Sequence, residues 1–164
     1  MAESNRDRIS PSLLDRLTDE APGDPSARGG VTLSELRKSV LRDLNWLFNA
    51  TQMESAEALE GYPLVAGSVI NYGLPAFSGM TASGMDIRAM ENALRQAILD
   101  FEPRLLADSI RVCAHLIAEE QAHNRLSFDI ECRLWAQPAP IALLLHSDVD
   151  LENGQTTVAE SGRR

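Results

Sequence analysis

The hydrophobic periodicity of this chain changes at Pro103, and this change constrains the fold more than any other feature. Before it, apolar residues between positions 87 and 101 recur every three or four positions, which predicts an amphipathic helix. After it, apolar and polar residues alternate over residues 110–116 and 126–134, which predicts half-buried antiparallel strands. Proline lacks an N–H group and disfavours a helical conformation at Glu102, so the helix should end there.

Two more helices are expected upstream. Thr32 and Glu35 form a capping-box pattern before a long amphipathic helix. Its expected buried residues are Leu33, Leu36, Val40, Leu41, Leu44, Leu47 and Phe48. Trp46 lies off this stripe, and an exposed tryptophan there would mark an interface. Residues 64–71 are expected to form a short helix with Leu64, Val65, Ser68 and Val69 turned inward.

The register of the first two strands follows from the need to keep both apolar sets on one face. Paired residue numbers must then have an even sum, and a sum near 244 pairs Val112 with Cys132 and His115 with Asp129. This arrangement places Cys113 and Cys132 on opposite faces, so no disulfide is expected. His115 and Asp129 fit an exposed cross-strand pair better than a proton-transfer pair.

The carboxy-terminal part predicts a hairpin. Asn153 and Gly154 are typical of a type I′ turn, which sets Val149 opposite Val158. The last strand, residues 155–160, is short and polar and is expected at the sheet edge. Edge strands are templates for strand addition by a partner. The expected architecture is therefore α+β, with about three helices packed on a mostly antiparallel sheet of three or four strands.

The expected domain organisation is a flexible arm, one domain and a tail. Residues 1–30 form the arm, which carries a short amphipathic segment at residues 12–17. Residues 31–160 form the domain, and residues 161–164 form the tail. Leu13, Leu14 and Leu17 give the amphipathic segment one apolar face. Because an isolated turn is too short to be stable, it should dock either on this domain or on a partner.

Composition bounds the class of protein. The chain has 24 acidic and 15 basic side chains and a net charge of −9, which disfavours nonspecific binding to nucleic acid or to anionic membranes. The start of the chain has no apolar run, and no stretch reaches the length of a membrane helix, so a cytoplasmic protein is expected. Three scattered histidines and two cysteines do not predict a metal site. No catalytic residue and no cofactor is expected.

The sequence at residues 98–105 contains Glu102-Pro103-Arg104, a pair of opposite charges expected to project from a stiff corner. It resembles the glutamate-proline-arginine motif of the baseplate wedge family, which contractile phage tails and type VI secretion systems share. Residues 39–49 resemble the first core helix of that family, and residues 68–79 resemble its asparagine-tyrosine-glycine-leucine-proline loop. Residues 11–17 are typical of the secretion-system branch, the baseplate subunit TssE. The resemblance covers roughly residues 10–158.

The resemblance implies a structural role in a baseplate at the cytoplasmic side of the envelope. The implied partners are the wedge subunits TssF and TssG, with TssK in the same complex, and the sheath subunits TssB and TssC through strand addition. The strand contact is expected at about residues 143–158. The candidate partner-binding residues are Glu102, Pro103, Arg104, Leu13, Leu14, Leu17, Leu145, Val149 and Val158.

Two alternatives belong to other classes. The family has carried a lysozyme-like label, which raises peptidoglycan hydrolysis, with Glu102 as the proposed acid. Arg104 nearby favours the ionised form of that carboxylate, and aromatic residues make up only 5% of the chain, so the sequence gives this alternative little support. A free-standing protein-binding domain would share the fold but would not need the charged corner.

Overall fold

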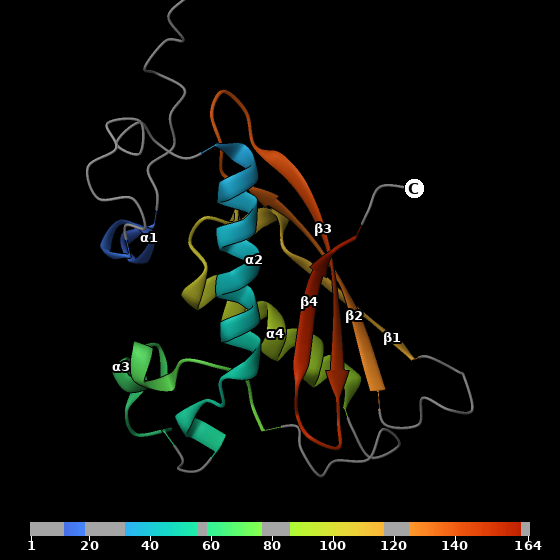
Figure 1. Ribbon diagram of the computed structural model, residues 1–164. Helices are drawn as coiled ribbons and strands as arrows, with labels where there is room; N and C mark the ends of the chain where they lie inside the picture. Colours follow the sequence, from blue (N-terminus) through green and yellow to red (C-terminus); the bar gives the residue numbers. More distant parts are fainter. Residues whose placement is uncertain (1–11, 19–31, 56–58, 77–85, 117–124, 162–164) are drawn as a thin grey trace, which may run out of the picture.

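The computed structural model describes residues 12–18, 32–55, 59–76, 86–116 and 125–161. Over these residues the chain forms four α-helices and one four-stranded antiparallel sheet, which confirms the α+β prediction (Figure 1). The helices are α1 (Leu13–Leu17), α2 (Leu33–Asn49), α3 (Pro63–Ala66) and α4 (Ile87–Phe101). The strands are β1 (Arg111–Leu116), β2 (Arg125–Leu134), β3 (Ile141–Asp150) and β4 (Thr156–Glu160), in that spatial order. Three 3₁₀ turns are η2 (Met53–Ser55), η3 (Val69–Asn71) and η5 (Ala107–Ser109).

Helices α2 and α4 cover one face of the sheet (Figure 1). The predicted capping box starts α2: Glu35 donates its backbone N–H to the Thr32 hydroxyl, and Thr32 donates its own to the Glu35 carboxylate. The buried residues of α2 are Leu36, Val40, Leu44, Leu47 and Phe48. Leu33 is exposed in the first turn, and Leu41 is half-buried. The buried face of α2 therefore follows the predicted stripe except at its first turn.

The core lies between these two helices and the inner face of the sheet. From α4 it takes Met90, Leu94, Ala97 and Ile98. From the strands it takes Leu126, Phe128, Ile130, Cys132, Leu134, Leu143, Leu145, Val149 and Val158. The alternating burial of β2 and β3 is the period-two pattern that the sequence shows.

The register of β1 and β2 keeps the predicted parity but is displaced by two residues. Val112 pairs with Ile130, not with Cys132, and Cys113 pairs with Asp129. An apolar pattern of period two fixes which face is buried, but it permits any even displacement, so the pattern could not choose between the two registers. Cys113 is exposed and Cys132 is buried, and both are free, as the parity predicted.

The turn between β3 and β4 is longer than predicted. Val149 pairs with Thr156 rather than with Val158, and five residues, 151–155, connect the strands. A type I′ turn needs positive φ at both central residues, but among the described non-glycine residues none has positive φ, and Gly154 alone supplies it here (φ 72°). The Asp150 carboxylate accepts a backbone N–H two residues on, at 2.9 Å, which stabilises the longer turn.

The segment after α2 differs most from expectation. Residues 64–71 do not form one helix: α3 ends at Ala66, and η3 follows it. Leu64 and Val69, expected inside, are 90% and 80% exposed, whereas Asn71 is buried. Gly73 fixes this arrangement, because a Cβ atom there would lie 2.4 Å from the carbonyl oxygen of Ala50.

Candidate partner-binding site

The charged corner predicted from the sequence begins where α4 ends. Glu102 is the C-cap residue of α4, and its backbone N–H bonds the carbonyl oxygen of Ile98. Its side chain is only 3% exposed. Pro103 follows at the surface, and Leu105 then enters the core. The chain therefore makes a tight corner with a buried carboxylate inside it.

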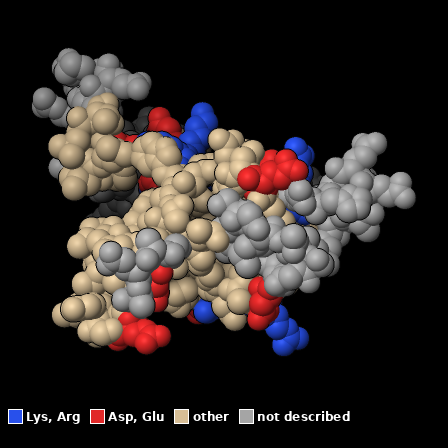
Figure 2. Space-filling model, turned by 90° about the horizontal axis from the view of Figure 1, so that it is seen from below, with Lys and Arg blue, Asp and Glu red and all other residues tan. Residues whose placement is uncertain are grey.

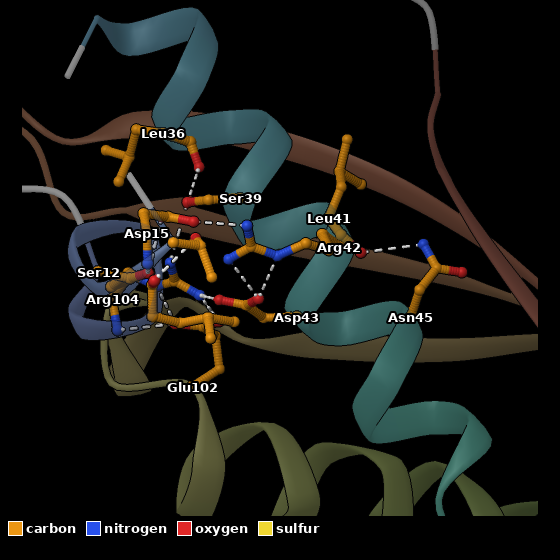
Figure 3. A network of polar contacts seen from close by, with 12 residues as sticks. Ser12, Asp15, Leu36, Ser39, Leu41, Arg42, Asp43, Asn45, Glu102 and Arg104 are labelled. Carbon is orange, nitrogen blue, oxygen red and sulfur yellow. Dashed lines mark hydrogen bonds and ion pairs between the residues drawn. The ribbon is translucent and has the colours of Figure 1, made fainter. Parts of the chain in front are cut away.

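Arg104 folds back over this corner instead of projecting from it (Figure 3). Its Nε atom lies 2.7 Å from Glu102 Oε1, and its Nη2 atom lies 2.5 Å from both Glu102 Oε2 and Asp43 Oδ2. Its Nη1 atom donates to the Ser39 hydroxyl at 3.0 Å. Burial opposes the charged guanidinium, but hydrogen bonds and charges of Glu102 and Asp43 outweigh it, so the pKa of Arg104 lies above its ordinary value.

This geometry corrects the expectation that Glu102 and Arg104 form an outward-facing pair. A buried carboxylate needs a partner, and Arg104 is the cation that the turn at Pro103 brings within reach. The bidentate contact uses both oxygens of Glu102, and Asp43 ties the pair to α2. Glu102 and Arg104 thus join the end of α4 to α2, and Pro103 is the exposed residue of the three.

The same polar network continues to the amino-terminal segment. Arg42 lies between Asp15 of α1 and Asp43 of α2, at 2.5 Å and 2.9 Å. The hydrogen bond from Arg42 holds the pKa of Asp15 below its ordinary value. The Arg42 guanidinium also lies 5.0 Å from the centre of the Trp46 ring, which is 52% exposed. α1 is therefore docked on this domain. The ion pair between Asp15 and Arg42 holds it there more than its leucine side chains do.

A groove of about 390 Å³ lies between α1, α2 and the corner. Its lining residues are Ser12, Leu14, Asp43, Leu44, Trp46, Leu47, Tyr72, Phe101, Glu102, Pro103 and Arg104. Two of these lining residues, Tyr72 and Phe101, pack edge to face, with ring centres 5.1 Å apart. Leu13 and Leu17 remain exposed on the outer side of α1. The structure thus brings together the corner and the amphipathic segment, two separate parts of the predicted site.

The carboxy-terminal hairpin is placed differently from expectation. Leu145, Val149 and Val158 are buried in the core, so their side chains do not face a partner. A partner strand at this hairpin could reach only its backbone groups and its outward-facing side chains.

The free edge of β4 is closed by two side chains of α2. Asn45 donates to the Val158 carbonyl oxygen at 3.1 Å and accepts the Val158 N–H at 3.0 Å. Asn49 makes the same two contacts with Thr156, at 2.7 Å and 3.0 Å. Four helical residues rise about 6.0 Å and two strand residues about 6.8 Å, so the two amides match alternate residues of the strand.

The opposite edge is partly covered in the same way by α4. Glu91 accepts the N–H of Ala114 at 2.8 Å, and Arg95 donates to the carbonyl oxygen of Ile110 at 3.3 Å. Sequence reasoning missed both pairs of edge contacts. The spacing of four residues within each pair, Asn45 with Asn49 and Glu91 with Arg95, is a signal that could have found them, but nothing in it identified the sheet edges as their partners.

Among the described residues, the remaining polar groups singled out by the sequence do not form a second candidate site. His115 reaches Asp129 diagonally at 3.0 Å, and His146 lies 2.7 Å from the same carboxylate, on the exposed face of the sheet. Burial raises the pKa of the Cys132 thiol to about 12, so it is not a reactive thiolate. In the parts of the chain that the structure describes, no group of three His, Cys, Asp or Glu side chains is placed to hold a metal ion. Within the same parts, none of the helices combines the length and apolar character needed to cross a membrane.

Comparison with known protein families matches residues 34–139 to the family described as baseplate wedge protein gp25. The match includes α2, the corner and both strands that follow it. Comparisons with curated proteins and with solved structures gave no match. The family match covers well over half of the chain, including the corner. The chain belongs to the baseplate wedge protein gp25 family and has a structural role in a baseplate.

Proposed function

We propose that this chain is the TssE subunit of a type VI secretion baseplate, which joins the wedge subunits TssF and TssG to the first ring of the sheath subunits TssB and TssC. Family membership supports the baseplate part of this proposal. The segment at residues 11–17, which resembles the secretion-system branch, supports the choice of machine. In this role the chain stands in the cytoplasm, in one complex with TssK, and performs no reaction.

The groove beside Pro103 is the observation that supports the proposed contact with the wedge subunits. It combines an exposed tryptophan, an exposed proline and a leucine of α1 with a packed pair of aromatic rings. Rigid aromatic and proline surfaces lose little entropy on docking, and tryptophan is frequent among residues that dominate binding energy. Glu102 and Arg104 act by holding the groove in shape, because their charges are already paired within the chain.

The experiment measures retention of the chain by a purified TssF–TssG complex. Trp46→Ala should reduce binding at least about tenfold, since a central tryptophan contributes about 1.4 kcal/mol or more. Trp135→Ala is the matched control, because Trp135 is 50% exposed, close to the 52% of Trp46, and does not line the groove. Equal binding by both variants, with unchanged circular dichroism, would contradict the wedge contact.

For the sheath contact, the open part of β3 is a better edge than β4. Pairing between β3 and β4 starts at Leu145, and Ser161 donates its N–H to the Leu144 carbonyl oxygen. No described residue pairs with the first three residues of β3 on this side. A hollow of about 850 Å³ lies beside them, lined in part by Ala142, Leu144 and Arg37.

Proline substitution distinguishes the β3 edge from the β4 edge as the binding site, since proline has no N–H to donate to a new strand. In an antiparallel strand alternate residues face the same neighbour, so Ala142 faces the β4 side and Glu160 faces away from β3. Ala142→Pro should abolish binding of a TssB–TssC sheath ring, whereas Glu160→Pro should leave it intact. The reverse result would place the sheath on β4 and require that Asn45 and Asn49 be displaced.

The geometry of the groove does not favour Glu102 as the acid of a hydrolase. A glycosidase needs two carboxylates that face a substrate cleft. The carboxylates that line the groove are those of Asp43 and Glu102, and both accept hydrogen bonds from Arg104. An assay of peptidoglycan release is the direct check, and activity that disappears in Glu102→Gln would revive this alternative.

A further inference from the structure

One stretch of the sequence lacks positive charge entirely. Between Asp43 and Asp86 there is no Lys or Arg, and the charged residues in this interval are three glutamates, at positions 54, 57 and 60. Residues 61–85 carry no charged side chain at all, in a chain of which 24% is charged. Depletion of charge is typical of the centre of a protein interface.

Among the described residues of this stretch, four large apolar side chains lie at the surface, whereas Leu74 is buried. Leu64 and Val69 are the most exposed of them, and Tyr62 and Ile70 are 65% and 63% exposed. These four side chains, from α3, η3 and the residue before α3, are called the 62–70 patch here. Four large apolar side chains exposed within nine residues are costly in water unless another surface covers them.

The 62–70 patch is held in place by buried polar groups, which reverses the usual arrangement. The Asn71 side chain is buried, and it donates to the Ala66 carbonyl oxygen at 3.0 Å while accepting the N–H of Glu54 at 3.0 Å. The Ser68 hydroxyl accepts the N–H of Ile70 at 3.3 Å. The polar residue points inward and the apolar residues point outward, so the fold presents an apolar surface that is already ordered before binding.

The border of the 62–70 patch is acidic. Glu60 precedes Tyr62, and Glu54 is attached to η3 through its bond to Asn71; both side chains are exposed. Figure 2, seen from below, shows uncharged atoms over much of this end of the molecule, with carboxylates and some Lys and Arg side chains around them. An acidic border repels an anionic membrane and a second copy of the same patch, and it attracts a basic border.

We propose that the 62–70 patch binds a protein partner whose apolar surface is flanked by Lys or Arg. This contact is separate from the groove at Pro103 and does not depend on the proposed role in secretion. It gives the chain a third contact surface, on α3 and η3. Apolar contact supplies its affinity, and Glu54 and Glu60 select the partner by charge.

A direct test uses a fluorescent 18-residue helical peptide with a leucine face flanked by lysines, and a second peptide with glutamates in place of the lysines. The full chain should bind the lysine peptide at least about tenfold more tightly than the glutamate peptide at low salt. Leu64→Ser with Ile70→Ser should remove this binding. Because both side chains are largely exposed, the double variant should keep its thermal melting temperature.

Two further variants distinguish the 62–70 patch from other surfaces. Leu13→Ser with Leu17→Ser removes exposed leucines from α1 and should leave peptide binding unchanged. Glu54→Lys with Glu60→Lys should reverse the preference, so that the glutamate peptide binds more tightly. Loss of binding in the α1 variant alone, or no reversal in the lysine variant, would overturn the proposal.

The same variants also test two other possible partners of the patch, a second copy of the chain and a lipid membrane. Sedimentation of the chain alone should show a monomer; a dimer that Leu64→Ser with Ile70→Ser dissociates would assign the patch to a second copy instead. Flotation with vesicles of zwitterionic and anionic lipid should show no binding. Vesicle binding that depends on Leu64 and Ile70 would assign the patch to a membrane, and it would also overturn the proposal.

Discussion

Replacement of Arg104 by methionine tests whether the charged corner holds the domain together. The substitution keeps most of the side-chain volume but leaves the buried Glu102 carboxylate without its bidentate partner. Removal of one partner of a buried ion pair typically costs about 3–5 kcal/mol. Because Arg104 is 23% exposed and Asp43 retains Arg42, we expect the lower end, about 3 kcal/mol of the free energy of unfolding.

Chemical denaturation followed by circular dichroism measures this loss, and a melting experiment should show a fall of about 10 °C. Arg133→Met is the matched control, because Arg133 pairs with Asp108 at the surface and should cost less than about 1 kcal/mol. Glu102→Leu combined with Arg104→Met should regain much of the lost stability, since it removes the unpaired charge. A cost below about 1 kcal/mol for Arg104→Met would refute the structural role of the pair.

Three further predictions concern other parts of the fold. Asn45→Leu should lower the free energy of unfolding by about 1–3 kcal/mol in urea denaturation, because it leaves the N–H of Val158 without a partner; a neutral effect would show that water replaces the amide. Gly73→Ala should cost about 1–3 kcal/mol or more, since φ is +130° and the new Cβ would meet Ala50, and a melting temperature equal to that of wild type would contradict this. The hydrogen bond to Asp129, with help from Asp148, raises the pKa of His146 above 6.5. The stabilisation by His146 should therefore be complete below pH 6.5 and disappear as pH rises through the raised pKa, so His146→Gln should lose more stability at pH 5.5 than at pH 8.5.

Sequence reasoning predicted the elements with strong periodicity. The buried stripe of α2, the end of α4 at Glu102 and the inward faces of β1 and β2 follow from apolar spacing and from the absence of an N–H group at Pro103. These signals are local. The register of β1 with β2 is not local, because a displacement by two residues buries the same side chains.

The candidate site was predicted in its parts but not in its geometry. The charged corner and Leu14 do line one groove, and Trp46 is exposed beside them. The direction of Arg104 could not be predicted, because Asp43 and Ser39, which hold it, lie more than 60 residues earlier in the chain. Charge alone does not tell a solvated pair from a buried one.

The prediction for the segment after α2 was wrong for a different reason. Leu64 and Val69 were expected inside because apolar residues are usually buried, but Gly73 and Asn71 fix a path that turns them outward. Tertiary contacts here override the local pattern. Such departures from local rules are most common where a protein binds something else.

The amide contacts between α2 and β4 also affect the order in which the molecule can assemble. They join residues 107 and 113 positions apart, so they close nearly the whole described domain into one loop. Contacts of such large sequence separation cost chain entropy and form late in folding. Loss of the last strand, by truncation or proteolysis, would leave the amides of Asn45 and Asn49 without these partners. Loss of β4 should therefore destabilise α2 directly.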